Sequence, residues 1–110
     1  MNFDEYQKMA MKTAVFPADD ERALYARVLG LVGETGEIAE KVKKMLRDKD
    51  NNYTQKDSDE IVKELGDVLW YLTATAEYFG SSISQVAENN IKKLSDRAKR
   101  GKIKGSGDNR

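Results

Sequence analysis

The chain lacks the residues on which several kinds of protein chemistry depend. It contains no cysteine and no histidine among its 110 residues. Disulfides, structural zinc sites, cysteine or histidine nucleophiles and imidazole acid–base catalysis are therefore excluded. Any bound metal must be held by oxygen ligands, which favours Mg²⁺, Mn²⁺ or Ca²⁺.

The chain also lacks a net charge, a long apolar run and a secretory signal. Lysine plus arginine and aspartate plus glutamate each number 19, which argues against a basic nucleic-acid-binding protein. No apolar run approaches the ~20 residues of a membrane span. Residues 1–5 form neither a basic nor an apolar signal segment. We therefore expect a cytoplasmic protein that binds neither membranes nor, stably, nucleic acids.

Proline is nearly absent as well, and the single Pro17 lies early in the chain. Long proline-free stretches rich in Glu, Lys, Ala and Leu predict an all-α domain over residues 1–101. Four helices are expected, at about 2–13, from 19 or 20 to 47, at 57–79 and at 83–100. Residues 102–110 are predicted to be a flexible tail, either a frayed terminus or a flap that orders on a ligand.

Local signals mark where these helices begin and where they meet a neighbour. Capping boxes are expected at Asn2, Asp57 and Ser82, each followed three residues later by Glu or Gln. Three glycines, Gly30, Gly33 and Gly36, interrupt the second helix, and each costs ~1 kcal/mol relative to alanine. Their presence predicts the close approach of another backbone or of a ligand.

Two acidic doublets are the most informative feature of the sequence. The second expected helix carries Glu34 and Glu37, and the third carries Glu64 and Asp67. Residues three apart share a helix face, so antiparallel packing would bring four carboxylates together at the edge of the core. Partly buried like charges raise one another's pKa, and a divalent cation offsets that repulsion. A solvated acidic face is the alternative, because charged residues make up 35% of the chain.

Further residues are candidates for contact with an organic phosphate. Tyr71 lies four residues after Asp67, hence above it on the same helix face, where it could stack on a bound group or simply pack. Asn90, Lys93 and Arg97 align on the fourth expected helix and suit phosphate recognition. The alternative for this basic row is a solvated stripe.

These motifs together resemble the MazG-like nucleoside triphosphate pyrophosphohydrolases of the all-α NTP pyrophosphatase superfamily. That family has an E-E-x-x-E motif followed by E-x-x-D on the next helix. Here the segments read LVGETGEIAEKVKK and KELGDVLWYL, and NIKKLSDR resembles the family's downstream Asn/Lys/Arg element. The resemblance extends from about Leu24 to the C-terminus. It departs at Gly33, where the fuller motif often has Glu, so one carboxylate is missing.

The resemblance implies a four-helix bundle that forms a homodimer or homotetramer. It also implies Mg²⁺-dependent cleavage of an NTP or dNTP to the monophosphate and pyrophosphate, with Mn²⁺ as a substitute. By match, the metal ligands are Glu34, Glu37, Glu64 and Asp67, and the phosphate or sugar contacts are Asn90, Lys93 and Arg97.

For the catalytic step, the chemistry requires a group that activates a water for attack on the α-phosphorus. Without histidine, this base is either a carboxylate or a metal-bound hydroxide. Glu37 is our choice for the base, and Glu34 is the second candidate catalytic carboxylate. A hypothesis from another class is a non-enzymatic helical interaction module, whose apolar faces bind a partner helix and whose acidic doublets are plain surface.

Overall fold

The computed structural model describes residues 1–16 and 20–110. Within those ranges the chain is all-α and contains no strand, as the sequence predicts. A short helix, α1 (Phe3–Ala10), continues into the 3₁₀ turn η1 (Met11–Thr13). It is followed by α2 (Glu21–Lys49), α3 (Gln55–Tyr78) and α4 (Ile83–Lys99). No helix in the described ranges is long and apolar enough to cross a membrane.

Side-chain caps fix the N-terminal ends of three helices. The Asn2 side chain accepts a hydrogen bond from the Glu5 backbone N–H, and Ser82 accepts one from Gln85, so both residues are N-caps as predicted. The return bond of a capping box is formed at neither, because the Glu5 side chain binds the Asn2 side chain and the Gln85 side chain binds Asn89. Asp20 caps α2 by accepting from the Arg22 backbone. The expected break around Pro17, and the alternative helix start at residue 19, lie outside the described residues.

The start of α3 differs from the prediction by two residues. The capping box uses Thr54 and Asp57 rather than Asp57 and Glu60. The Asp57 carboxylate accepts hydrogen bonds from the Thr54 backbone N–H at 2.8 Å and from the Lys49 ammonium at 2.7 Å. Because Asp57 binds both groups, the helix begins one half-turn earlier. It ends where expected, with Gly80 in the left-handed conformation at φ 71°.

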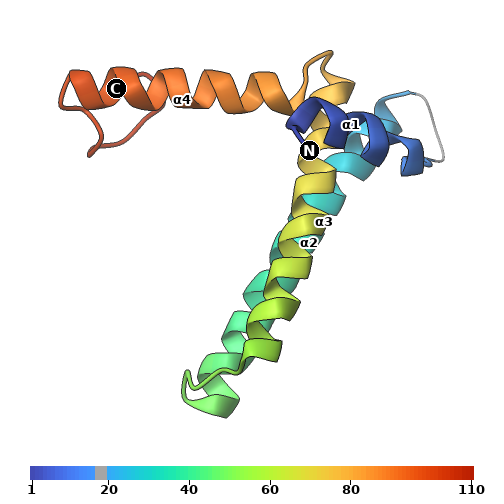
Figure 1. Cartoon of the computed structure of the whole chain (residues 1–110), viewed down its shortest axis with the longest axis vertical. Helices are drawn as coiled ribbons and strands as arrows, with labels where there is room; N and C mark the ends of the chain where they lie inside the picture. The colour runs from blue at the N-terminus through green and yellow to red at the C-terminus, as the bar shows by residue number, and fades with distance from the viewer. Residues whose placement is uncertain (17–19) are drawn as a thin grey trace.

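The helices α2 and α3 form an antiparallel hairpin that runs the length of the molecule (Figure 1). The most buried side chains lie near the end of the hairpin where α2 begins and α3 ends: Thr73 and Ala74 are fully buried there. Tyr71 lies directly in front of Gly30, and a Cβ at that position would overlap the tyrosine ring. The glycines predict the close approach of another backbone or of a ligand; at Gly30 it is a side chain, the Tyr71 ring, that comes close.

The short helix α1 ties the hairpin to α4. The Trp70 indole N–H donates to the Thr13 hydroxyl at 2.9 Å, which fastens η1 to α3. The Gln7 side chain accepts from the Ile83 backbone N–H at 2.8 Å and so occupies a free donor at the start of α4. These contacts fix the elbow, residues 79–82, from which α4 departs.

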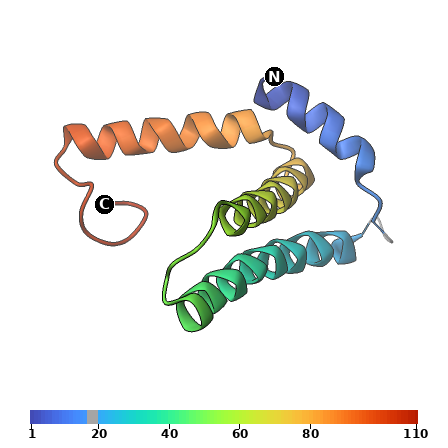
Figure 2. The same ribbon diagram turned by 60° about the horizontal axis from the view of Figure 1, so that its bottom comes forward.

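From that elbow α4 points away from the hairpin (Figure 1), and α3 lies between α2 and α4 (Figure 2). The Cα radius of gyration is 17.0 Å, whereas a compact chain of this length has one of ~13 Å. A single chain therefore has the four helices of the expected fold, but only α2 and α3 pack along their lengths. Large apolar side chains remain exposed on all three long helices, among them Leu29, Val32, Leu46, Val62, Leu65, Val86 and Ile91.

Candidate active site

Three of the predicted carboxylates meet on the hairpin. Glu34 of α2 and Glu64 and Asp67 of α3 each offer an oxygen, and these oxygens lie within 4.8 Å of one another. The antiparallel packing of α2 and α3 sets this register, as the doublets predicted. Glu34 and Glu64 are half-buried and Asp67 is exposed, so the cluster is open to solvent on one side.

The electrostatics of this cluster reflect crowding of like charges. Burial raises the pKa of the Glu34 carboxyl, and the nearby charges of Asp67 and Glu64 raise it further. Lys41 forms an ion pair with Glu64 at 3.7 Å, which compensates only part of the negative charge. A hard divalent cation would balance such a set of carboxylates, so the donor chemistry fits Mg²⁺ or Mn²⁺.

Glu37 is not part of the close group. It lies one turn further along α2, on the exposed side of that helix. Its charge nevertheless contributes to the raised pKa of Glu34, so it borders the cluster. A spacing of three residues turns the side chain by ~60° around the helix axis, which explains why one member of the doublet faces α3 and the other faces solvent.

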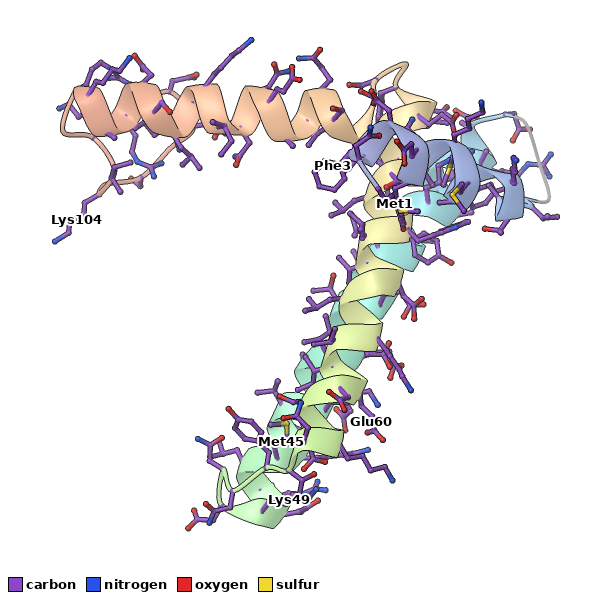
Figure 3. The ribbon with its side chains drawn as sticks, in the orientation of Figure 1. Met1, Phe3, Met45, Lys49, Glu60 and Lys104 are labelled. Carbon is purple, nitrogen blue, oxygen red and sulfur yellow. The ribbon has the colours of Figure 1, made fainter. Side chains whose placement is uncertain are left out.

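Tyr6 is a neighbour of the cluster that the sequence did not reveal. The pKa of its hydroxyl is raised by burial and by the charge of Asp67. A cavity of about 540 Å³ opens beside it and is lined by Met1 and Phe3, and the Phe3 ring points into the inner angle between α3 and α4 (Figure 3). In the sequence Tyr6 is one apolar position of an amphipathic helix, and nothing in that pattern places α1 beside Asp67.

Tyr71 has a packing role in the hairpin. Its half-buried ring contacts Gly30 and makes an edge-on contact with Trp70, with ring centroids 4.9 Å apart. The predicted contact with substrate is a separate property and stays a prediction. The spaces in front of Gly33 and Gly36 are open in a single chain.

The basic row lies on α4, apart from the acidic cluster. At about 1.5 Å per residue, Lys93 is about 15 Å from the start of α4. By the same rise, Asp67 is about 16 Å back from the end of α3. Because the two helices diverge at the elbow (Figure 1), the structure does not bring Asn90, Lys93 and Arg97 to the carboxylates of the same chain.

The tail instead meets two members of this row. Lys93 donates to the Asp108 carboxylate at 2.9 Å, and Arg97 donates to the Asp108 backbone carbonyl at 2.6 Å. Asn90 and Lys93 also line a shallow cavity of about 350 Å³ on the same helix. The flexibility predicted for residues 102–110 stays a prediction.

The residues of the acidic cluster and of the basic row lie within a segment that matches a known family. The model of the MazG nucleotide pyrophosphohydrolase domain matches residues 24–101. The chain belongs to the MazG nucleotide pyrophosphohydrolase family. The family is generally dependent on divalent metal ions, in agreement with the carboxylate cluster of this MazG domain.

A relative from a bacteriophage is similar over its whole length. The Gene 37 protein of Mycobacterium phage L5 is 47% identical over 114 aligned residues, and the alignment covers both chains completely. Its name specifies no activity. No solved structure matches this chain.

Proposed function

We propose that this MazG domain hydrolyses a nucleoside or deoxynucleoside triphosphate to the monophosphate and pyrophosphate, with Mg²⁺ or Mn²⁺ as cofactor. The observation that supports this most is the meeting of Glu34, Glu64 and Asp67 within 4.8 Å, inside the segment that matches the family. Nucleotides carry their phosphates as metal complexes, so a half-exposed carboxylate cluster suits them as a binding site.

The proposed metal ligands are Glu34, Glu64 and Asp67, with Glu37 as the fourth. When bound, a divalent cation would neutralise charge on the phosphate oxygens as the transition state forms. Lys41, paired with Glu64, would hold that carboxylate in place. Unlike the other three, Glu37 is exposed and lies outside the close group.

The reaction needs a group that takes a proton from the attacking water. We assign this role to Glu37, whose exposed carboxylate borders the cluster, with Glu34 as the second candidate. The water oxygen forms a bond to the α-phosphorus, and the bond from that phosphorus to the bridging oxygen breaks. Pyrophosphate then leaves with the electron pair of that bond.

Stabilisation of the leaving pyrophosphate is proposed to come from Asn90, Lys93 and Arg97, with Tyr71 contacting the nucleoside. In a single chain the basic row on α4 lies far from the carboxylates on α2 and α3. The two groups of one chain therefore cannot bind the same nucleotide. We therefore propose that the active protein is a homodimer, or a homotetramer built from such dimers, in which α4 of a second copy supplies the basic row.

Exposed apolar residues on α2 and α3 support the proposal that a second copy of the chain covers these two helices. On α2, Leu29 and Val32 are 70% and 63% exposed, and on α3 Val62 and Leu65 are 62% and 51% exposed. Along each helix these residues follow helical spacing, so each stripe continues beyond the hairpin contact. Large contiguous apolar surface of this kind marks an interface, and a second hairpin carries the matching stripe.

The experiment that tests the activity is hydrolysis of a panel of NTPs and dNTPs in water enriched in ¹⁸O, with Mg²⁺, with Mn²⁺ and with chelator. Attack on the α-phosphorus predicts that the label enters the monophosphate and that pyrophosphate is unlabelled. A diphosphate plus orthophosphate would contradict the assignment. The matched control is Glu40→Gln, because Glu40 is a carboxylate of the same helix that pairs with Lys43, outside the cluster.

A non-enzymatic interaction module is the second candidate, and the exposed apolar stripes are the observation in its favour. It predicts no turnover of any nucleotide in the panel and no effect of Mg²⁺ on stability. It still predicts self-association or binding of a partner helix.

A further inference from the structure

The C-terminal tail occupies the site on α4 that the proposed function assigns to phosphate. Residues 102–110 turn back against α4 (Figure 1), with Lys104 at the far side of the loop (Figure 3). The Asp108 carboxylate accepts from Lys93 at 2.9 Å and from Arg97 at 3.3 Å. Its backbone carbonyl accepts from the same Arg97 at 2.6 Å.

The loop that delivers Asp108 is defined by backbone turns and by its last residue. Gly101, Gly105 and Gly107 have φ values of 67°, 121° and 84°, a region that favours glycine. The Arg110 guanidinium donates to the carbonyls of Gly107 at 2.6 Å and Ile103 at 3.1 Å, and thereby closes the loop on itself. These bonds lie within the tail, and the Asp108 bonds join it to α4.

The contact covers Arg97 almost completely. The Arg97 side chain is only 6% exposed, whereas the Asp108 side chain that binds it is 81% exposed. Lys93 holds the pKa of Asp108 below its ordinary value, so the carboxylate stays ionised at neutral pH. An incoming phosphate therefore meets Arg97 only after the tail has moved.

We propose that Asp108 is an internal anion that fills the Lys93–Arg97 site in the free protein, and that the phosphate groups of the nucleotide displace it. This proposal rests on the proposed function in one respect: Lys93 and Arg97 must be phosphate contacts. A carboxylate offers one negative charge and a triphosphate offers several, so the nucleotide binds Lys93 and Arg97 more tightly than Asp108 does. The tail lowers apparent affinity by the fraction of time that it occupies the site.

Kinetic measurements on Asp108→Asn test the exchange. Removing the charge of the internal anion should lower KM for the nucleotide by about two- to fivefold and leave kcat unchanged, because the Asp108 carboxylate is 81% exposed and a solvated partner makes an ion pair weak. Arg110→Ala, which opens the loop, should shift KM in the same direction. The control is Asp96→Asn, because Asp96 is an exposed carboxylate of α4 that pairs with Arg100 at 2.8 Å. A KM that is unchanged or raised in Asp108→Asn overturns the proposal.

Release of the tail can be observed without turnover. Because the chain has no cysteine, Asn109→Cys creates a unique site for an environment-sensitive fluorophore. Titration with inorganic pyrophosphate should then give a saturable change in emission, and Arg97→Met should abolish that change. Binding of pyrophosphate should be followed in parallel by calorimetry on the same labelled protein.

The outcomes separate this proposal from the proposed function. A fluorescence change with pyrophosphate in a protein that hydrolyses no nucleotide would support the tail exchange and contradict the enzymatic assignment. Turnover and pyrophosphate binding without any fluorescence change would leave the enzyme in place and overturn the exchange. Failure of pyrophosphate to bind would also overturn it, since no anion would then compete with Asp108.

Discussion

The ring of Tyr71 on α3 occupies the space in front of Gly30 on α2, at a position where α2 has no side chain. By contrast, the positions in front of Gly33 and Gly36 are open in a single chain. Glycine thus has different structural roles at neighbouring turns of α2. Gly30 is required by packing inside the hairpin, and the other two lie beside the acidic cluster and the exposed stripe.

Gly30→Ala should destabilise the hairpin although alanine is the better helix former. Its Cβ would displace the Tyr71 ring, and overpacking of a fitted contact costs about 1–3 kcal/mol. Gly33→Ala is the matched control, which should gain up to about 1 kcal/mol from helix propensity alone. Urea unfolding of both variants at one protein concentration measures the difference. Equal free energies of unfolding would show that Tyr71 moves aside without cost.

Removing a carboxylate from the cluster should weaken the stabilisation by Mg²⁺. A ligand that binds only the folded state raises the midpoint of thermal unfolding in proportion to the logarithm of its concentration over its dissociation constant. Glu64→Gln should therefore lose most of the Mg²⁺-induced rise that the parent shows relative to chelator. Glu40→Gln should keep it, because Glu40 is bound to Lys43 and Lys44.

The variant Glu37→Gln tests whether Glu37, the exposed member of the α2 doublet, is the catalytic base. In chelator we expect the variant to be as stable as the parent or slightly more stable, because one repelling charge is gone. We expect activity to fall by about 10²-fold or more if Glu37 is the base. Retention of both activity and the Mg²⁺ response would remove Glu37 from the site and leave the three carboxylates that lie within 4.8 Å.

Asp57 should make the start of α3 sensitive to acid. Its hydrogen bond with Lys49, and then that with the Thr54 backbone, lower its pKa from 3.8 to about 2. The stability that it contributes is therefore complete above pH 3.8 and lost as the pH falls toward 2. The difference in free energy of unfolding between parent and Asp57→Asn should shrink over that interval. Lys49→Met removes the hydrogen bond that lowers the pKa of Asp57 most. In this variant the free energy of unfolding should therefore fall less between pH 3.8 and pH 2 than it does in the parent.

An acidic residue in the exposed stripe of α2 should dissociate the proposed oligomer. Val32→Glu places a charge where a second copy would bury an apolar side chain that is 63% exposed in one chain. Light scattering should then report a monomer of 12.4 kDa at micromolar concentration, whereas the parent should report at least twice that mass. Lys12→Glu on η1 is the control. A monomeric parent would contradict the dimer, and with it the shared site.

Local patterns in the sequence determined much of this molecule. The helical spacing of apolar residues, the caps at Asn2 and Ser82 and the stop at Gly80 identified four helices, because each depends on groups within one helical turn. The acidic doublets likewise indicated a carboxylate cluster. Antiparallel pairing of two adjacent helices is enough to bring Glu34 against Glu64 and Asp67.

Other features depend on contacts between segments that are distant in the sequence, and only the tertiary structure showed them. Thr54 replaced Asp57 as the cap of α3, because Lys49 across the turn also binds the Asp57 carboxylate. The approach of Tyr6 to Asp67 depends on where α1 packs, and the pairing of Asp108 with Arg97 depends on a turn through several glycines. The direction of α4 is set at the elbow, where Gln7 binds the first turn of that helix. Helical periodicity shows which face of a helix is apolar, but the packing partner of that face is fixed only when the helices come together.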